Sequence, residues 1–134
     1  LKVRWPYTTK QVTYTLVQKV EYLNTRKKIL IIDDEQDLCS LLKVYFSRKN
    51  YVVHYTHTLQ EGVQEMQSLH PDILFLDNNL PDGIGWMQVE FFLKENPQLQ
   101  LYLMSGYQPK APELPGLQFQ VLTKPISFAD LDHL

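Results

Sequence analysis

The sequence predicts an α/β protein in which one five-stranded parallel sheet carries helices on both faces. Short apolar runs, each the length of a buried strand, alternate along residues 27–134 with amphipathic segments of helical period. Runs without polar interruption, such as Ile29–Ile32 and Ile73–Leu76, indicate strands that are buried on both faces. Because strand–helix–strand alternation requires crossover connections, and these join parallel strands, the sheet is predicted to be doubly wound.

The composition is that of an ordinary globular domain. The chain has 134 residues, 44% of them hydrophobic and 21% charged, with a formal net charge of −2. This slightly acidic balance gives no sign of a nucleic-acid surface, since basic residues cluster only at 26–28. No apolar run reaches membrane-spanning length, and the amino end has no secretory pattern. The single cysteine, Cys39, excludes an internal disulfide and is predicted to be a small buried residue.

Residues 1–26 are predicted to form an extension or linker outside the main domain, which spans residues 27–134. Four apolar residues recur at helical spacing: Val12, Leu16, Val20 and Leu23. We therefore predict an amphipathic helix, although the alternation over 12–16 also fits a strand. The segment is open to three interpretations: the tail of an upstream domain, an interdomain linker, or a helix that packs back over apolar surface. Because the chain starts on Leu1 and not on Met, we expect a fragment or a processed product.

The main domain contains nine predicted elements in alternating order. The apolar runs predict strands over residues 29–32, 51–55, 73–77, 99–104 and 119–122. The amphipathic segments predict helices over residues 38–46, 59–66 and 86–94, and a short last helix that begins at Ser127. Thr58 with Glu61, and Ser127 with Asp130, have the spacing of residues that cap a helix start. The natural closure of this order is a flavodoxin-like sheet with strand order 2-1-3-4-5.

Polar residues follow four of the predicted strands. The first strand ends at Asp33 and Asp34, the third at Asp77, the fourth at Ser105 and the fifth at Lys124. In an open α/β sheet the carboxyl ends of the strands share one edge, where ligands bind, so we expect these side chains to lie together. The residues 78–83 that follow Asp77 are typical of a loop.

Three carboxylates at one edge raise one another's pKa, and a divalent cation relieves this repulsion. Oxygen ligands with room for water favour Mg²⁺. An ion of this kind, the Lys124 ammonium and the Ser105 hydroxyl would cradle a phosphoryl group while an aspartate attacks it in line. Structural alternatives stay open: the aspartates are also helix-capping and turn residues, Ser105 suits a turn, and Lys124 suits an exposed surface.

With these residues in place, 27–134 resembles the receiver domain of two-component response regulators. The resemblance rests on four motifs, each at its expected strand end: Asp33-Asp34, Leu76-Asp77-Asn78-Asn79-Leu80-Pro81-Asp82-Gly83, Ser105-Gly106 and Lys124-Pro125. It implies that Asp77 accepts a phosphoryl group from a histidine kinase or a histidine phosphotransfer protein. It also implies that the domain then switches conformation, as a cytoplasmic phosphoprotein of a two-component system or phosphorelay. A downstream effector domain is a further implied partner, whereas direct contact with nucleic acid or membrane is not.

The same resemblance assigns roles around the acceptor. Asp34, Asp77 and the backbone carbonyl of Asn79 are implied to hold Mg²⁺, with Asp33 acting mostly through water. Lys124 is implied to pair with the acceptor before transfer and with the phosphoryl group afterwards, and Ser105 to bond a phosphoryl oxygen and move inward. The peptide bond before Pro125 is expected to be cis. The histidines (His54, His57, His70 and His133) show no metal-ligand spacing and receive no role.

Three features depart from the family pattern. Residues 107–116, where a fourth helix is expected, contain Pro109, Pro112 and Pro115, so we predict a loop or one short turn. Val121 stands where the family usually has Tyr or Phe, and the last helix is cut short at Leu134. These departures fall on the face commonly used for output, and they argue against dimerisation through that face.

The departures leave an alternative function open: a degenerate receiver that binds partners without phosphorylation. A dedicated phosphohydrolase is less well supported, because Asn79 stands two residues after Asp77, where such an enzyme would need a general acid. We therefore expect slow self-dephosphorylation and no dedicated enzymatic activity.

Overall fold

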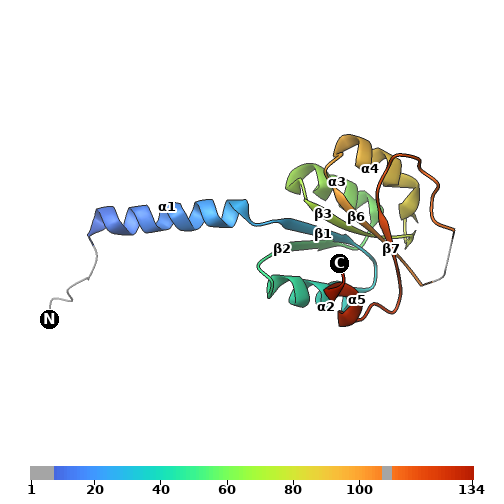
Figure 1. Cartoon of the computed structure of the whole chain (residues 1–134), viewed down its shortest axis with the longest axis horizontal. Helices are drawn as coiled ribbons and strands as arrows, with labels where there is room; N and C mark the ends of the chain where they lie inside the picture. Colours follow the sequence, from blue (N-terminus) through green and yellow to red (C-terminus); the bar gives the residue numbers. More distant parts are fainter. Residues whose placement is uncertain (1–7, 107–109) are drawn as a thin grey trace.

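The predicted sheet is confirmed in a computed structural model that describes residues 8–106 and 110–134. Five parallel strands lie in the order β2-β1-β3-β6-β7 (Figure 1). They are β1 (Lys28–Ile32), β2 (Val52–Thr56), β3 (Ile73–Asp77), β6 (Gln100–Ser105) and β7 (Gln120–Thr123). Since β6 and β7 are the fourth and fifth strands of this sheet along the chain, the order is the expected 2-1-3-4-5.

Helices cover both faces of the sheet (Figure 1). The helices α2 (Gln36–Ser47) and α5 (Phe128–Asp132) lie on one face, and α3 (Leu59–Leu69) and α4 (Val89–Glu95) lie on the other. Successive side chains of a strand point to opposite faces, so Ile29 and Ile31 join one core and Leu30 and Ile32 join the other. All four are fully buried. This two-sided burial explains the uninterrupted apolar runs.

The segment after Asp77 was predicted as a loop, and this prediction is wrong in part. It contains a short antiparallel hairpin, β4 (Asn79–Leu80) and β5 (Gly83–Ile84), closed by a turn through Pro81 and Asp82. Asp82 also accepts hydrogen bonds from the first two N–H groups of α3, at 2.7 and 2.9 Å, and so ties the hairpin to that helix. The predicted helix over 86–94 begins as a 3-10 turn, η1 (Gly85–Gln88), before it continues as α4.

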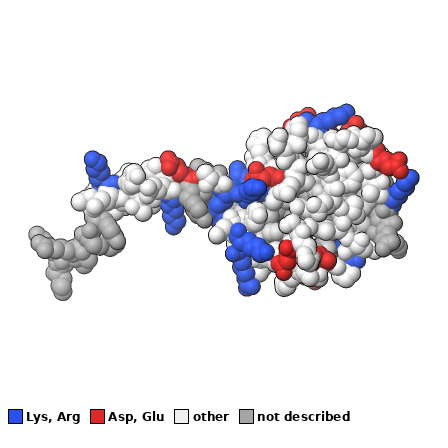
Figure 2. All heavy atoms as spheres, viewed as in Figure 1, with Lys and Arg blue, Asp and Glu red and all other residues white. Residues whose placement is uncertain are grey.

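The amino-terminal segment forms the predicted helix, α1 (Thr9–Thr25), but it does not pack back onto the domain. It extends away from the body (Figure 1), and every residue from Thr8 to Glu21 is exposed. Over residues 8–21, the interpretation in which the segment covers apolar surface is therefore wrong. Arg26 fixes the exit of the helix, because its guanidinium donates to the carbonyls of Asn50 and Tyr51 at 2.7 and 3.0 Å. Figure 2 shows basic side chains gathered at this junction.

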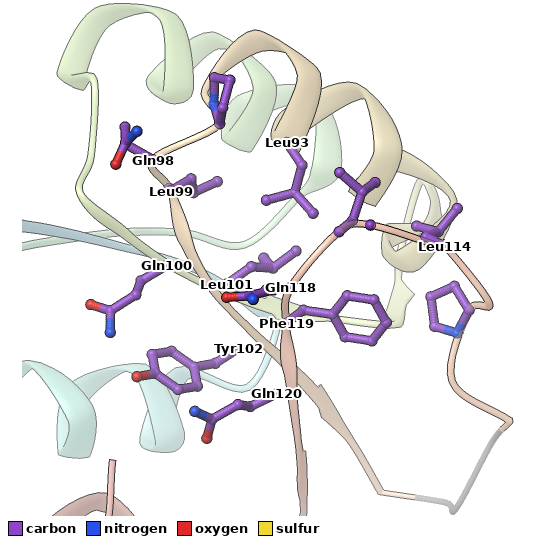
Figure 3. A pocket seen from close by; sticks show the side chains of 14 residues that line it. Leu93, Gln98, Leu99, Gln100, Leu101, Tyr102, Leu114, Gln118, Phe119 and Gln120 are labelled. Carbon is purple, nitrogen blue, oxygen red and sulfur yellow. The ribbon is translucent and has the colours of Figure 1, made fainter.

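The helix that would be expected between β6 and β7 is absent from the described part of the 107–116 segment, as predicted. Residues 110–119 form no helix, and residues 107–109, with Pro109, lie outside the described residues. A groove of about 890 Å³ lies between α4, β6 and the segment that leads into β7 (Figure 3). Its lining combines leucines with glutamines: Leu93, Leu99, Leu101, Gln98, Gln100, Gln118 and Gln120. Val121, on the neighbouring edge strand, is 42% exposed.

Smaller sequence predictions are also confirmed. The Lys124–Pro125 peptide bond is cis. Cys39 is buried, and its thiol donates to the carbonyl of Asp33 at 3.3 Å. The hydroxyls of Thr58 and Ser127 accept the N–H groups three residues on and cap α3 and α5. No helix in the described residues is long and apolar enough to cross a membrane.

Candidate functional site

Three carboxylates from two strand ends meet at the carboxyl edge of the sheet. Asp33 and Asp34 follow β1, and Asp77 ends β3, the strand next to it. Each offers an oxygen that lies within 4.8 Å of the others. Asp33 and Asp77 are buried, with 0% and 4% exposure, whereas Asp34 is exposed. The cluster therefore has an enclosed floor and one carboxylate that faces solvent.

Asp33 is fixed in place by hydrogen bonds through both its backbone and its side chain. Its N–H donates to the carbonyl of Thr56 at 3.1 Å, and its Oδ1 accepts the N–H of Glu35 at 2.8 Å. Its carbonyl oxygen lies 2.9 Å from Nδ1 of His57, a histidine to which the sequence gave no role. Burial raises the pKa of Asp33, although the hydrogen bonds from Lys124 and Glu35 oppose this.

Lys124 brings the positive charge to the site from the end of β7. Its Nζ lies 2.7 Å from Asp33 Oδ2, 2.9 Å from Glu35 Oε1 and 3.3 Å from Asp77 Oδ1. Its side chain is 11% exposed. Burial opposes its charge, but the hydrogen bonds to Asp33 and Glu35 outweigh burial and raise its pKa. Glu35 was missed at the sequence level, because nothing local separates it from an ordinary helix start.

The surroundings of Asp77 strongly perturb its ionisation. Its burial raises its pKa, and the nearby charge of Asp33 raises it further, while Lys124 opposes both. The result is a pKa of about 6. A carboxylate that resists ionisation in this way gains from any further positive charge that binds beside it.

The two remaining predicted residues differ in burial: Ser105 is buried and Asn79 is exposed. Ser105 is buried at the end of β6, one residue beyond Met104, the register partner of Asp77. Its carbonyl accepts the N–H of Lys124 at 2.7 Å, which joins the ends of β6 and β7. Asn79 lies in the β4 strand of the hairpin, and its side chain is exposed. The other predicted residues stand at the carboxyl ends of neighbouring strands of the five-stranded sheet, whereas Asn79 belongs to the separate hairpin that follows β3.

Fold and site together define a class: a doubly wound α/β protein with an acidic, lysine-bearing pocket at the carboxyl ends of its strands. The model of the response regulator receiver domain family matches residues 29–134. The chain therefore belongs to the response regulator receiver domain family, and it is part of two-component signalling.

Curated relatives agree with this family. The response regulator protein PilR of Pseudomonas aeruginosa is 29% identical over 114 residues, which cover 82% of this chain and 25% of PilR. The TorCAD operon transcriptional regulatory protein TorR of Escherichia coli K12 is 31% identical over 107 residues, 77% of this chain and 46% of TorR. The chain thus spans between a quarter and half of the length of these relatives.

Solved structures share the fold. A CheY-like receiver domain protein from Methanospirillum hungatei has a TM-score of 0.72 at 24% identity, covering 81% of this chain and 90% of that one. The response regulator TrrA from Thermotoga maritima, solved in complex with Mg²⁺-BeF, has a TM-score of 0.69 at 22% identity. That match covers 80% of this chain and 94% of TrrA.

Proposed function

We propose that this receiver domain accepts a phosphoryl group on Asp77 in a Mg²⁺-dependent reaction and then changes conformation to signal. The donor is a histidine kinase or a histidine phosphotransfer protein, and the reader is a partner or an effector domain in the cytoplasm. The proposal rests on one observation: Asp77 lies in a cluster with two other carboxylates and the Lys124 ammonium. The existence of effector domains beside the receiver agrees with the greater length of its relatives.

The residues of the cluster fit a magnesium ion. Three carboxylates against one ammonium leave an excess of negative charge, and all the candidate ligand atoms are oxygens. We assign Asp34, Asp77 and the backbone carbonyl of Asn79 to the ion, with Asp33 acting mostly through water. When bound, the ion neutralises negative charge on the phosphoryl oxygens. The response regulator TrrA, which shares this fold, was solved in complex with Mg²⁺-BeF, and this supports the choice of Mg²⁺ as the ion.

The transfer is a displacement at phosphorus. An oxygen of ionised Asp77 forms the new bond, and the bond between phosphorus and the donor imidazole nitrogen breaks, with its electron pair left on that nitrogen. Lys124 is already within 3.3 Å of Asp77 and neutralises charge on the transferred group. Ser105, at the adjacent strand end, donates its hydroxyl to a phosphoryl oxygen. The burial of Asp77 keeps bulk water from the new acyl phosphate.

Loss of the phosphoryl group is slow self-dephosphorylation and not a dedicated enzymatic activity. Asn79, two residues after Asp77, has an amide side chain with no titratable proton and so offers no general acid or base toward water. The phosphorylated state then lasts long enough to shift a conformational equilibrium that a partner reads.

Incubation with acetyl phosphate and MgCl₂, followed by intact-mass measurement, tests the proposal. We expect a mass gain of one phosphoryl group, which chelation of the metal or the substitution Asp77→Asn abolishes. Asp37→Asn, which changes an exposed carboxylate outside the cluster, is the matched control and keeps the gain. No gain in the unaltered protein would favour a phosphorylation-independent interaction module, and rapid turnover of the donor would favour a phosphohydrolase.

A further inference from the structure

We propose that Glu35 is a positioning residue that draws the Lys124 ammonium toward itself and so weakens its contact with Asp77 until a phosphoryl group arrives. The inference rests on the proposed function and concerns the regulation of the same site. It starts from the three ion pairs of the Lys124 ammonium. A lysine ammonium has three N–H donors, and here three carboxylates lie within 3.3 Å of it. Its two shorter contacts go to Asp33 and Glu35, and the longest goes to the acceptor Asp77.

The backbone around Glu35 fixes where its side chain starts. Glu35 occupies the N-cap position of α2 in an extended conformation, and its side chain makes no capping hydrogen bond. Its N–H donates to Asp33 Oδ1 at 2.8 Å, and its carbonyl accepts the N–H of Cys39 at 3.1 Å. Because the N–H and the carbonyl of Glu35 are both engaged, its backbone is fixed. The length of its side chain then decides whether its carboxylate reaches Lys124, which lies 89 positions further along the chain.

The three contacts of Lys124 differ in what it costs to break them. The Asp33 and Asp77 side chains are 0% and 6% exposed, so removing the ammonium would leave a buried charge without its partner. The Glu35 side chain is 59% exposed, and water can replace the ammonium there at small cost. When a phosphoryl oxygen on Asp77 requires a donor, the contact with Glu35 is therefore the one that gives way.

A variant that lacks the contact between Glu35 and Lys124 should be phosphorylated faster than the unaltered protein. Without Glu35, the ammonium is shared by Asp33 and Asp77 alone and moves toward the acceptor. An exposed ion pair of this kind is weak, so we expect the phosphorylation rate to rise about two- to fivefold. The same change is expected for Glu35→Ala, which deletes the carboxylate, and for Glu35→Asp, which keeps the charge but shortens the side chain by one methylene.

Phosphorylation rates with acetyl phosphate at fixed Mg²⁺ test this inference in the full chain. The control is Asp37→Ala, which removes an exposed charge from the first turn of the same helix and is expected to leave the rate unchanged. If Glu35 acted only by repelling the anionic donor, Glu35→Asp would behave like the unaltered protein and Asp37→Ala would be faster, which would overturn the inference.

Thermal unfolding of the same samples separates positioning from folding, because Glu35 makes no cap bond and neither variant is expected to unfold at a lower temperature. A faster rate that tracks a lower melting temperature would count against the inference. The two proposals fail differently. An unaltered protein that takes up no phosphoryl group refutes the proposed function. Rates that are equal in the unaltered protein and both Glu35 variants refute only the role of Glu35.

Discussion

A methyl group added at Gly85 should disturb the acceptor directly. Gly85 is buried at the start of η1, where the chain passes the end of β3. A Cβ built on it would overlap the carbonyl oxygen of Asp77, well inside the 3.4 Å at which ordinary contact begins, and would lie 3.1 Å from Leu76 Cδ1. Since the nearest atom belongs to the backbone, no side-chain rotation relieves the overlap, and one of the two segments must move in Gly85→Ala.

The size of the effect follows from what that movement breaks. Forcing extra volume into a packed site costs about 1–3 kcal/mol. The Gly85 N–H also donates to the carbonyl of Asn78 at 2.8 Å, and losing this hydrogen bond adds about 1 kcal/mol. For a domain of this size, a total of about 2–4 kcal/mol lowers the melting temperature by roughly 8–16 °C.

Thermal unfolding followed by circular dichroism measures this loss, and intact mass after acetyl phosphate treatment measures the acceptor. Gly85→Ala should lose stability, and below its melting temperature it should take up the phosphoryl group more slowly, because the Asp77 backbone has moved. Gly106→Ala is the matched control: this exposed glycine follows Ser105, and a Cβ there meets nothing within 4 Å. A Gly85→Ala protein as stable as the control would refute the reasoning.

Three further predictions concern the ionisation of Asp77, the ionisation of Asp82 and the amino-terminal helix. The pKa of Asp77 is raised to about 6, so between pH 4 and 6 the folded state binds more protons than the unfolded one, and the free energy of unfolding falls as the pH rises. In metal-free buffer at pH 8, Asp77→Asn should therefore melt above the unaltered protein and lose this advantage near pH 4; equal melting temperatures at pH 8 would contradict it. Asp82→Asn should melt lower at pH 8, because hydrogen bonds from the Leu59 and Gln60 N–H groups lower the Asp82 pKa. Deleting residues 1–24 should shift the melting temperature by less than about 2 °C, since α1 is exposed over 8–21; a drop of several degrees in calorimetry would show that α1 supports the domain.

Much of the fold could be predicted because its information is local. The strand residues Ile29–Ile32 and Ile73–Leu76 are buried on both faces of the sheet. A strand of this kind needs an apolar residue at every position, which makes it recognisable as an uninterrupted apolar run. Helices were recognisable from their apolar period and from capping residues such as Ser127, whose bonds to Asp130 span three positions. The lack of helix over residues 110–119 was equally predictable from local information, since Pro112 and Pro115 each remove a backbone donor.

Local information failed where a residue's partner is distant or where packing sets the outcome. The hairpin after Asp77 was predicted as a loop, because turn residues do not reveal that Asp82 is tied to the start of α3. The amphipathic period of α1 predicted a helix, but it does not say whether anything covers its apolar side chains. The structure leaves those over residues 8–21 exposed.

The sequence by itself determined which residues end each strand, and the rule that parallel strands share a carboxyl edge placed Asp33, Asp77 and Lys124 together. Only the tertiary structure decided how they meet. It buried Asp33 completely, left the Glu35 side chain in solvent, and set Lys124 nearer to both than to Asp77. The reason is physical: topology fixes positions to within a strand end, whereas the ammonium's choice among three carboxylates depends on ångström differences and on burial, which no local pattern encodes.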